Sequence, residues 1–525
     1  MFAIESRAWL LAVVSAALQI LIFPLPNWYW LSWIAVAPLL VALLRARRRA
    51  GLQLEGPVKL AAASPLQGFA LGYLTGILWY GGNCYWVYST MKQYGGISAS
   101  GALGLLILFC LYLALYHGAF GLAISLLARM SERTALVLSP LVWVAIELAR
   151  SRISGFPWDL LGITQVDNIP LAAIATVTGV YGVSLEIMIV NAAFAAAFLL
   201  RRIERRRLFA AALAAAFLLQ IARWIPAPPF AHDRSAVLVQ QNIPVLASAD
   251  WTPQYFEDTL ADLIRLSLNS PPAGRASPDL IAWPESPAPF STGDPVFRTA
   301  LGGIARAGPA WVVAGSVGAG NPPQPDQIFN SAVLVRPDGQ VVARYDKVHL
   351  VPFGEYVPFG NLLSFAGGLT KEVGAFSRGG SRQPLEAGDQ RLGIFICYES
   401  VFPDEVRQFA KNGAQVFVNI SNDGWYGDTG AYAQHLAQAR MRAVENARWL
   451  LRATNTGVTA AIDPAGRVVA RAPRKVRTAL KASYALANAT TFYTRHGDWL
   501  AYGCAIISLG AILAALTSVK ARRQA

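Results

Sequence analysis

The sequence LGIFICYESVFP, residues 392–403, joins a short apolar strand to a reactive side chain. Residues 392–396 are apolar or glycine, as in a buried strand, and Cys397 follows where that strand ends. A layered fold holds the backbone rigid at such a position while the side chain faces a cleft. The stretch therefore predicts a layered domain with a candidate nucleophile at one strand end.

Strands and helices alternate on both sides of this stretch, across residues 225–495. Turn sequences such as RPDG at 336–339 and DPAG at 463–466 separate them. This alternation predicts an α/β or α+β domain. The expected strands are 236–241, 279–283, 311–315, 331–335, 341–344, 392–396, 415–420 and 458–462, and the expected helices are 253–268, 295–307, 402–412 and 432–450.

The rest of the chain differs from a soluble protein in composition. Of the 525 residues, 54% are hydrophobic and only 14% are charged, whereas a soluble domain carries about 25% charged residues. A helix that crosses the hydrocarbon core needs about 20 apolar residues. We therefore expect a polytopic membrane protein with eight transmembrane helices, which excludes one large cytosolic enzyme. The apolar runs are 8–25, 28–44, 65–88, 97–128, 134–149, 171–200, 208–224 and 499–518.

Basic residues in the short loops predict the orientation of these helices. One side of the array holds only Lys92, Arg150 and Arg152, and the other side holds all the remaining loop cations. Because cytoplasmic loops are enriched in Lys and Arg, both termini are expected in the cytoplasm. The net charge of +14 is thus attributed to membrane topology, and no nucleic acid is expected as a partner. The cytoplasmic set is Arg7, Arg45, Arg47, Arg48, Arg49, Lys59, Arg129, Arg133, Arg201, Arg202, Arg205, Arg206, Arg207, Lys520, Arg522 and Arg523.

This topology divides the chain into three parts. Residues 1–224 are expected to form seven transmembrane helices, and residues 496–525 the eighth with a basic tail. Residues 225–495 are then expected to form a domain on the outer side of the membrane, which is the periplasmic side if the membrane is a bacterial inner membrane.

Cys397 is the only cysteine of this external domain. A lone thiol in an oxidising compartment cannot form an internal bridge, so a nucleophile is favoured over a buried packing residue. Glu285 follows the strand that ends in IAWP, and Lys347 follows VVARYD. A carboxylate, an ammonium and a thiol could together form an acyl-transfer site, although each could also serve separately in an ion pair or in the core. With no phosphate-binding glycine loop, HExxH motif or paired Cys/His spacing, neither a cofactor nor a metal is expected.

Several separated motifs resemble the carbon–nitrogen hydrolase (nitrilase) superfamily, which implies an α-β-β-α sandwich and a Glu-Lys-Cys triad. The flanking apolar helices and one further motif are similar to its membrane-embedded branch, the apolipoprotein N-acyltransferases. The resemblance covers essentially the whole chain. The motifs are WPES at 283–286, YDKVHLVPFGEYVP at 345–358, ICYESVFP at 396–403, NDGWYG at 422–427 and the helix 437–457, with SGFPWDLLGITQ at 154–165 for the branch.

The resemblance implies that Glu285 is the general base, that Lys347 stabilises the oxyanion, and that Cys397 is the nucleophile. Glu355 is expected to support the lysine and the base. The remaining candidates are supporting or substrate-binding residues with open alternatives: Tyr398 and Glu399 as pocket residues, Asn330 as a hydrogen-bonding or turn residue, and Trp251 and Trp425, with Phe359 and Phe365, as lid aromatics, core caps or bilayer-interface anchors.

The implied reaction is ping-pong acyl transfer in lipoprotein maturation. Cys397 takes an acyl chain from a phospholipid, with phosphatidylethanolamine expected, and passes it to the α-amino group of a diacylglyceryl-cysteine on an apolipoprotein. A membrane-tethered amidase with the same triad is the main alternative, and a receptor or transporter with an external domain is another. Only the last has no need for the three side chains to converge. A monomer is expected, since no heptad pattern calls for a dimer.

Overall fold

The computed structural model describes residues 4–48, 60–199, 202–226, 229–245, 251–269, 277–285, 290–320, 325–352, 354–356 and 376–524. The chain forms two compact units. The helical unit comprises Met1–Tyr88, Ser100–Ala227 and Asp498–Ala525, and the α/β unit comprises Ser89–Ala99 and Pro228–Gly497. Of the basic residues above, Arg49, Lys59 and Arg201 lie outside the described residues.

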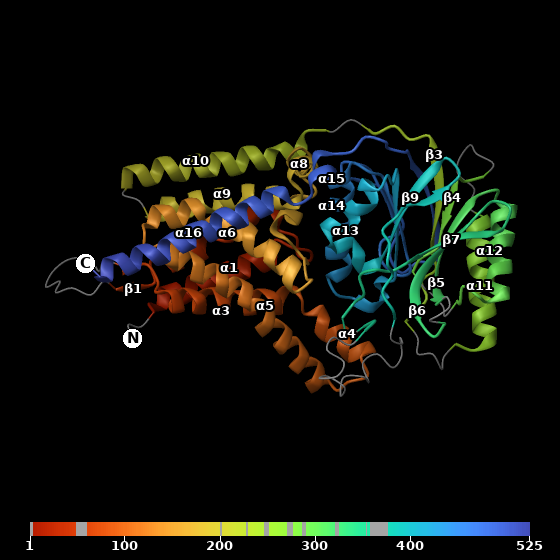
Figure 1. Ribbon diagram of the computed structural model, residues 1–525, viewed down its shortest axis with the longest axis horizontal. Helices are drawn as coiled ribbons and strands as arrows, with labels where there is room; N and C mark the ends of the chain where they lie inside the picture. The colour runs from red at the N-terminus through yellow and green to blue at the C-terminus, as the bar shows by residue number, and fades with distance from the viewer. Residues whose placement is uncertain are drawn as a thin grey trace. The chain divides into compact units, whose positions relative to one another are not determined.

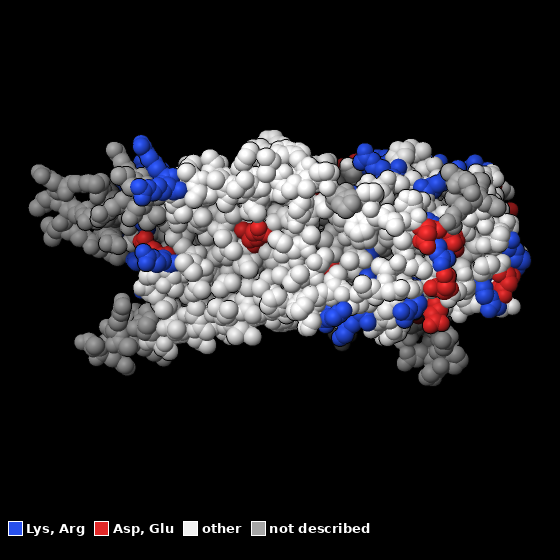
Figure 2. Space-filling view, turned by 90° about the horizontal axis from the view of Figure 1, so that it is seen from above, with Lys and Arg blue, Asp and Glu red and all other residues white. Residues whose placement is uncertain are grey.

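Long apolar helices dominate the helical unit, as in a multi-pass membrane protein (Figure 1). Within the described residues, five helices are long and apolar enough to cross a membrane. On the face shown in Figure 2, charged residues are sparse along the helical unit and spread widely over the α/β unit. The five are α5 (Ala99–Leu127), α6 (Glu132–Ile153), α9 (Val180–Leu199), α10 (Arg202–Ile221) and α16 (Trp499–Gln524).

The remaining expected spans form shorter or interrupted helices. The first three runs fold into α1 (Ser6–Leu21), η1 (Tyr29–Trp33) with α2 (Ala37–Leu44), and α3 (Pro65–Asn83) followed by α4 (Trp86–Tyr94). The run 171–200 is not one helix, because Gly179 adopts a φ of 67° and separates α8 (Ala175–Thr178) from α9. The run still supplies α9, which is one of the five span candidates in the described part of the chain.

Glycines allow α3 and α5 to pack closely. Gly68, Gly72 and Gly76 are spaced four residues apart on α3. A Cβ at Gly72 would lie 2.2 Å from the carbonyl oxygen of His117, and one at Gly121 would lie 2.1 Å from that of Gly68. Only glycine fits at these contacts, which is the small-residue packing typical of membrane helices.

The α/β unit contains two six-stranded sheets. The first has the order β14-β3-β4-β5-β6-β7, with β3, β4 and β5 parallel, and the second has the order β13-β12-β11-β10-β9-β8, with β9, β10 and β11 parallel. The first sheet consists of β3 (Arg234–Gln240), β4 (Leu280–Ala282), β5 (Trp311–Ala319), β6 (Ile328–Val335), β7 (Val341–Asp346) and β14 (Thr478–Tyr484). The second consists of β8 (Leu385–Ala387), β9 (Gln390–Ile396), β10 (Val416–Ser421), β11 (Leu450–Thr454), β12 (Ala460–Ile462) and β13 (Val468–Arg471).

The strand period of two places one face of each sheet in a shared core. In β3, Ala236 and Leu238 join a core that includes residues of both sheets, while Val237 and Val239 face a second core beneath α11 (Pro253–Leu268) and α12 (Pro295–Ala307). Helices α13 (Pro403–Lys411) and α14 (Ala431–Asn446) cover the other sheet (Figure 1). The unit is thus an α-β-β-α sandwich, the fold that the sequence resemblance implies.

Local sequence explains where α11 and α12 begin. Each starts with a proline after a capping residue: the Thr252 hydroxyl accepts from the N–H of Tyr255 at 3.2 Å, and Asp294 accepts from that of Val296 at 2.7 Å. Both helices match their predicted bounds. The predicted helix 432–450 is wrong at its end, because Ala447 takes a left-handed φ of 49° and β11 begins at Leu450.

Candidate active site

Three strand ends supply the triad side chains. Glu285 lies shortly after β4, Lys347 directly after β7 in the same sheet, and Cys397 directly after β9 in the other sheet. All three are buried, with exposed fractions of 5%, 1% and 6%. The two facing sheets therefore bring together a carboxylate, an ammonium and a thiol, each on a rigid backbone.

Lys347 lies between two carboxylates. Its Nζ is 3.2 Å from Oε1 of Glu285 and 2.8 Å from Oε1 of Glu355. The Asn330 amide donates to the same two oxygens, at 2.8 and 2.7 Å. Asn330, which the sequence left open as a turn residue, thus lies within β6 and links both glutamates.

Main-chain donors fix the other oxygen of each glutamate. The N–H of Asn422 donates to Oε2 of Glu285 at 2.8 Å, and that of Val351 donates to Oε2 of Glu355 at 2.8 Å. Both carboxylates are consequently held by donors on each oxygen, which fixes their orientation beside Lys347.

The charges around the site determine its resting protonation state. Burial by itself lowers the pKa of Lys347, but Glu285 and Glu355 outweigh burial and raise it, so the ammonium persists at neutral pH. Burial raises the pKa of Cys397, Glu285 raises it further, and Lys347 opposes both. Cys397 therefore rests as a thiol, and a base must remove its proton during the reaction.

Glu399 fastens the backbone on both sides of the site. Its Oε1 accepts from the Tyr345 hydroxyl and the N–H of Val348, each at 2.8 Å, and its Oε2 accepts from the N–H of Ile396 at 2.7 Å. These bonds tie the end of β7, next to Lys347, to the end of β9, next to Cys397. Burial raises the pKa of Glu399, which the main-chain donors oppose.

The expected aromatic residues lie in different places. Tyr398 packs edge-on against Phe402, with ring centroids 5.1 Å apart. Trp425 lies in η7 (Asp423–Tyr426), and its ring is 5.3 Å from that of Tyr94. Trp251 packs against the core beneath α11 and is grouped with that core rather than with the triad. Phe359 and Phe365 lie outside the described residues.

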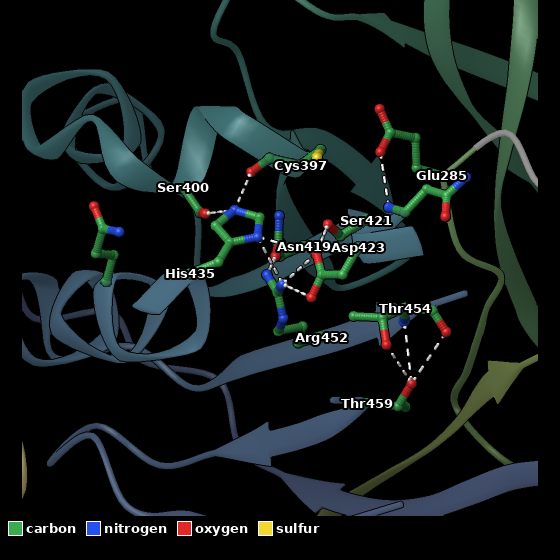
Figure 3. Close-up of polar contacts among 12 residues, drawn as sticks. Glu285, Cys397, Ser400, Asn419, Ser421, Asp423, His435, Arg452, Thr454 and Thr459 are labelled. Carbon is green, nitrogen blue, oxygen red and sulfur yellow. Dashed lines mark hydrogen bonds and ion pairs between the residues drawn. The ribbon is translucent and has the colours of Figure 1, made fainter. Parts of the chain in front are cut away.

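A second polar cluster was missed by sequence reasoning. Asp423, His435 and Arg452 are buried beside Cys397, with Ser400 and Ser421 (Figure 3). Two signals were available: Asp423 lies in the NDGWYG motif, and Arg452 is a charged residue in the otherwise uncharged strand LLRAT. Among the residues that the structure describes, no group of three or more His, Cys, Asp or Glu side chains is arranged to hold a metal ion.

A buried Glu-Lys-Cys constellation between two facing sheets defines a domain of the carbon–nitrogen hydrolase class. Residues 236–492 match the family model described as carbon-nitrogen hydrolase, and residues 15–193 match that of the apolipoprotein N-acyltransferase N-terminal domain. The apolipoprotein N-acyltransferase of Geobacter metallireducens is 36% identical, over 98% of this chain and 96% of its own length. That of Photobacterium profundum is 30% identical, over 95% and 93%.

The chain belongs to the apolipoprotein N-acyltransferase family and is an acyltransferase of the nitrilase superfamily. Among solved structures, a carbon-nitrogen hydrolase from Helicobacter pylori is 17% identical, covers 48% of this chain and 88% of its own, and gives a TM-score of 0.37.

Proposed function

We propose that Cys397 carries the acyl chain as a thioester between a phospholipid donor and an apolipoprotein acceptor. In the first half-reaction, Glu285 takes the thiol proton while the sulfur attacks the ester carbonyl. The S–C bond forms, the ester C–O bond breaks, and Glu285 returns the proton to the leaving lysophospholipid oxygen. The observation that carries this proposal is the Lys347 ammonium, buried 3.2 Å from Glu285 and interacting electrostatically with Cys397.

The second half-reaction follows from the same groups. The α-amino group of the acceptor's diacylglyceryl-cysteine attacks the thioester, its excess proton passes to Glu285, and the sulfur leaves to regain a proton. A free α-amino group has a reference pKa of about 7.7–8.0, so its neutral form is accessible at physiological pH. Lys347 stabilises the oxyanion in both halves, because a fixed buried cation needs no reorganisation as negative charge develops.

Supporting residues hold this machinery in place. Glu355 and Asn330 position Lys347 and Glu285, and Glu399 fixes the strand ends around Cys397. We assign Tyr398, Trp425 and Trp251 to the substrate-binding surroundings, with Trp251 packed against the core beneath α11. Phosphatidylethanolamine is the proposed acyl donor.

The proposed topology retains eight spans with both termini in the cytoplasm. Residues 1–224 supply seven helices, residues 225–495 the catalytic domain on the periplasmic side, and residues 496–525 the eighth helix and tail. Loop charge supports this arrangement. The phospholipid and the lipoprotein are then anchored in the same leaflet and reach the enzyme by diffusion in the membrane. A tethered amidase with a soluble substrate would have no need of this arrangement.

Intact mass spectrometry of the purified protein tests the proposal. Incubation with phosphatidylethanolamine alone should add one acyl chain to the wild type and none to Cys397→Ala. Addition of a diacylated lipopeptide should then remove the adduct and yield the triacylated product. An adduct that never forms, or that decays equally fast without lipopeptide, would contradict acyl transfer and favour the tethered amidase.

A further inference from the structure

A buried ionic cluster lies under the nucleophile and has no part in the chemistry above. Asp423 comes from η7, His435 from α14 and Arg452 from β11, and each is at most 1% exposed. Arg452 donates to both carboxylate oxygens of Asp423, at 3.0 and 2.8 Å. Three separate elements thus converge on one point beside Cys397 (Figure 3).

The His435 ring connects this cluster to the backbone of the nucleophile. Its Nε2 is 3.1 Å from the carbonyl oxygen of Cys397 and 2.8 Å from the hydroxyl oxygen of Ser400. Its Nδ1 is 3.1 Å from a guanidinium nitrogen of Arg452 and 3.0 Å from Oδ1 of Asp423. One ring therefore reaches from the ion pair to the main chain of the reactive residue.

These contacts select the proton position on the ring. With the proton on Nε2, the ring donates to the Cys397 carbonyl and its Nδ1 accepts from Arg452. Only one contact then pairs two acceptors, that of Nδ1 with Asp423. With the proton on Nδ1 alone, two contacts fail: Nδ1 and Arg452 are both donors, and Nε2 and the Cys397 carbonyl are both acceptors. Burial and Arg452 lower the pKa of His435, which favours a neutral ring. The neutral Nε2–H form satisfies the larger number of contacts.

Cys397 needs such an anchor more than an ordinary residue does. Its φ of 50° lies in the left-handed region, which residues with a Cβ seldom adopt. Its thiol also feels this cluster electrostatically, because Asp423, which accepts from the Ser421 hydroxyl at 2.7 Å, raises the pKa of the thiol. The Cys397 carbonyl is thus held through His435, and the Cys397 thiol lies within the field of the Asp423 carboxylate.

We propose that His435 is a positioning residue for acyl transfer: its Nε2–H, oriented by Arg452 and Asp423, holds the main-chain carbonyl of Cys397 and so directs the thiol toward the acyl carbonyl. This inference rests on Cys397 being the nucleophile, as proposed above. His435 itself touches no substrate and exchanges no proton in the reaction.

Two substitutions by amide side chains test the contacts of Nε2 and those of Nδ1 separately. In His435→Gln the side-chain amide reaches the place of Nε2 and can donate to the Cys397 carbonyl. In His435→Asn the shorter amide reaches only the place of Nδ1 and contacts Asp423 and Arg452. Glu445→Gln, which breaks the buried pair of Glu445 with Arg442 at 2.8 Å on the same helix, is the control for destabilisation alone.

The measurements are the single-turnover rate of thioester formation, the KM for phosphatidylethanolamine, the melting temperature and the rate of Cys397 alkylation by iodoacetamide. His435→Asn should slow thioester formation by about 100-fold, as a misplaced reacting group does, with KM unchanged. His435→Gln should recover most of this rate, Glu445→Gln should keep it, and alkylation should slow only in His435→Asn.

Equal losses in the Gln and Asn variants, a loss expressed in KM, or a loss that follows melting temperature in all three variants would overturn the positioning role. Failure of the proposed function is distinguishable, because then the wild type itself forms no acyl adduct. The alkylation comparison still tests His435 in that event, since it reports on the thiol without requiring a lipid substrate.

Discussion

At the scale of single residues, the site is defined by how it distributes charge at rest. Lys347 is held as an ammonium by two carboxylates, and Cys397 is held as a thiol by burial and by Glu285. An enzyme with a permanent thiolate would expose it to oxidation in the proposed compartment. In the proposed mechanism the thiolate forms only when Glu285 accepts the proton, which avoids this exposure. The nucleophile also stays strong, because the nucleophilicity of a thiolate rises with the pKa of its thiol.

Opposite effects on thiol reactivity should follow from removing the two charges. Glu285 raises the pKa of Cys397, so Glu285→Gln should lower that pKa and increase the thiolate fraction at a given pH. Lys347 lowers it, so Lys347→Met should decrease the thiolate fraction. In the wild type the pKa of Cys397 is raised, so the rate of alkylation by iodoacetamide should keep rising above the ordinary thiol pKa of about 8.5.

The measurement is the alkylation rate against pH, followed by intact mass. Glu285→Gln should shift the profile to lower pH and Lys347→Met to higher pH, while both variants lose acyl transfer. Glu257→Gln, an exposed residue of α11, should leave profile and activity as in the wild type. Shifts of the same sign in both active-site variants would contradict the charge arrangement.

That Glu285, Lys347 and Cys397 converge could be predicted, because each follows a recognisable strand within a motif. Their catalytic roles stay predictions. The His435 cluster could not be predicted, since its members are separated along the chain and meet only through tertiary packing. Arg452 pairs with Asp423, which lies 29 positions away, and His435 reaches Cys397 across 38 positions. In the sequence, a single histidine on a helix cannot be told from an ordinary core residue. Only the contact of His435 with the Cys397 carbonyl indicates another role.

At the scale of elements, the site is built from the ends of strands, and some of the strands beside them could not be predicted from the sequence. Patterns of apolar residues predicted α11 and α12 and most central strands, because burial on one or both faces leaves a clear period. Strands β8, β11, β13 and β14 were missed. Pairing of β14 with β3 joins residues 478–484 to 234–240, and no local pattern encodes such a distant contact.

Helix α4 belongs in part to the α/β unit, although it lies between two apolar stretches of the sequence. The Thr90 hydroxyl donates to the carbonyl of Trp425 at 2.9 Å, and the Tyr94 hydroxyl donates to that of Gly424 at 3.0 Å. Both acceptors lie in η7, which follows Asn422, the donor to Glu285. The helix thereby supports the segment that orients Glu285, the proposed general base.

Tyr94→Phe should consequently lower the rate of acyl transfer, by roughly fivefold, because a lost hydrogen bond is worth about 1 kcal/mol. The ring contact with Trp425 is preserved in this variant, so the loss reports on the Gly424 bond alone. Tyr255→Phe, on the ring that packs with Trp251 at 5.0 Å, is the matched control. Steady-state kinetics that show an unchanged kcat in Tyr94→Phe would separate α4 from the catalytic base.

At the scale of the whole molecule, composition separates two kinds of surface. The helical unit carries few charges along its length, and the α/β unit carries many (Figure 2). That contrast could be predicted from hydropathy. The bounds of a helix inside an apolar run could not, because a glycine break such as Gly179 leaves the run 171–200 apolar throughout while interrupting its helix. Sidedness depends on loop charge alone and therefore calls for a direct test.

Cysteine labelling can determine sidedness in a Cys397→Ala background, where the remaining cysteines, Cys84, Cys110 and Cys504, are buried. Asp338 lies in the turn after β6 with a side chain 47% exposed, and Glu132 begins α6 with a side chain 36% exposed. The charge pattern places the first outside and the second in the cytoplasm. With the outer membrane permeabilised, a membrane-impermeant maleimide should label Asp338→Cys at once and Glu132→Cys only after the inner membrane is opened. The reverse order would invert the proposed topology. The proposed topology has an odd number of crossings between Glu132 and Asp338, α6 included. Labelling of both sites before opening would contradict it, because two sites on one side of a membrane are separated by an even number of crossings.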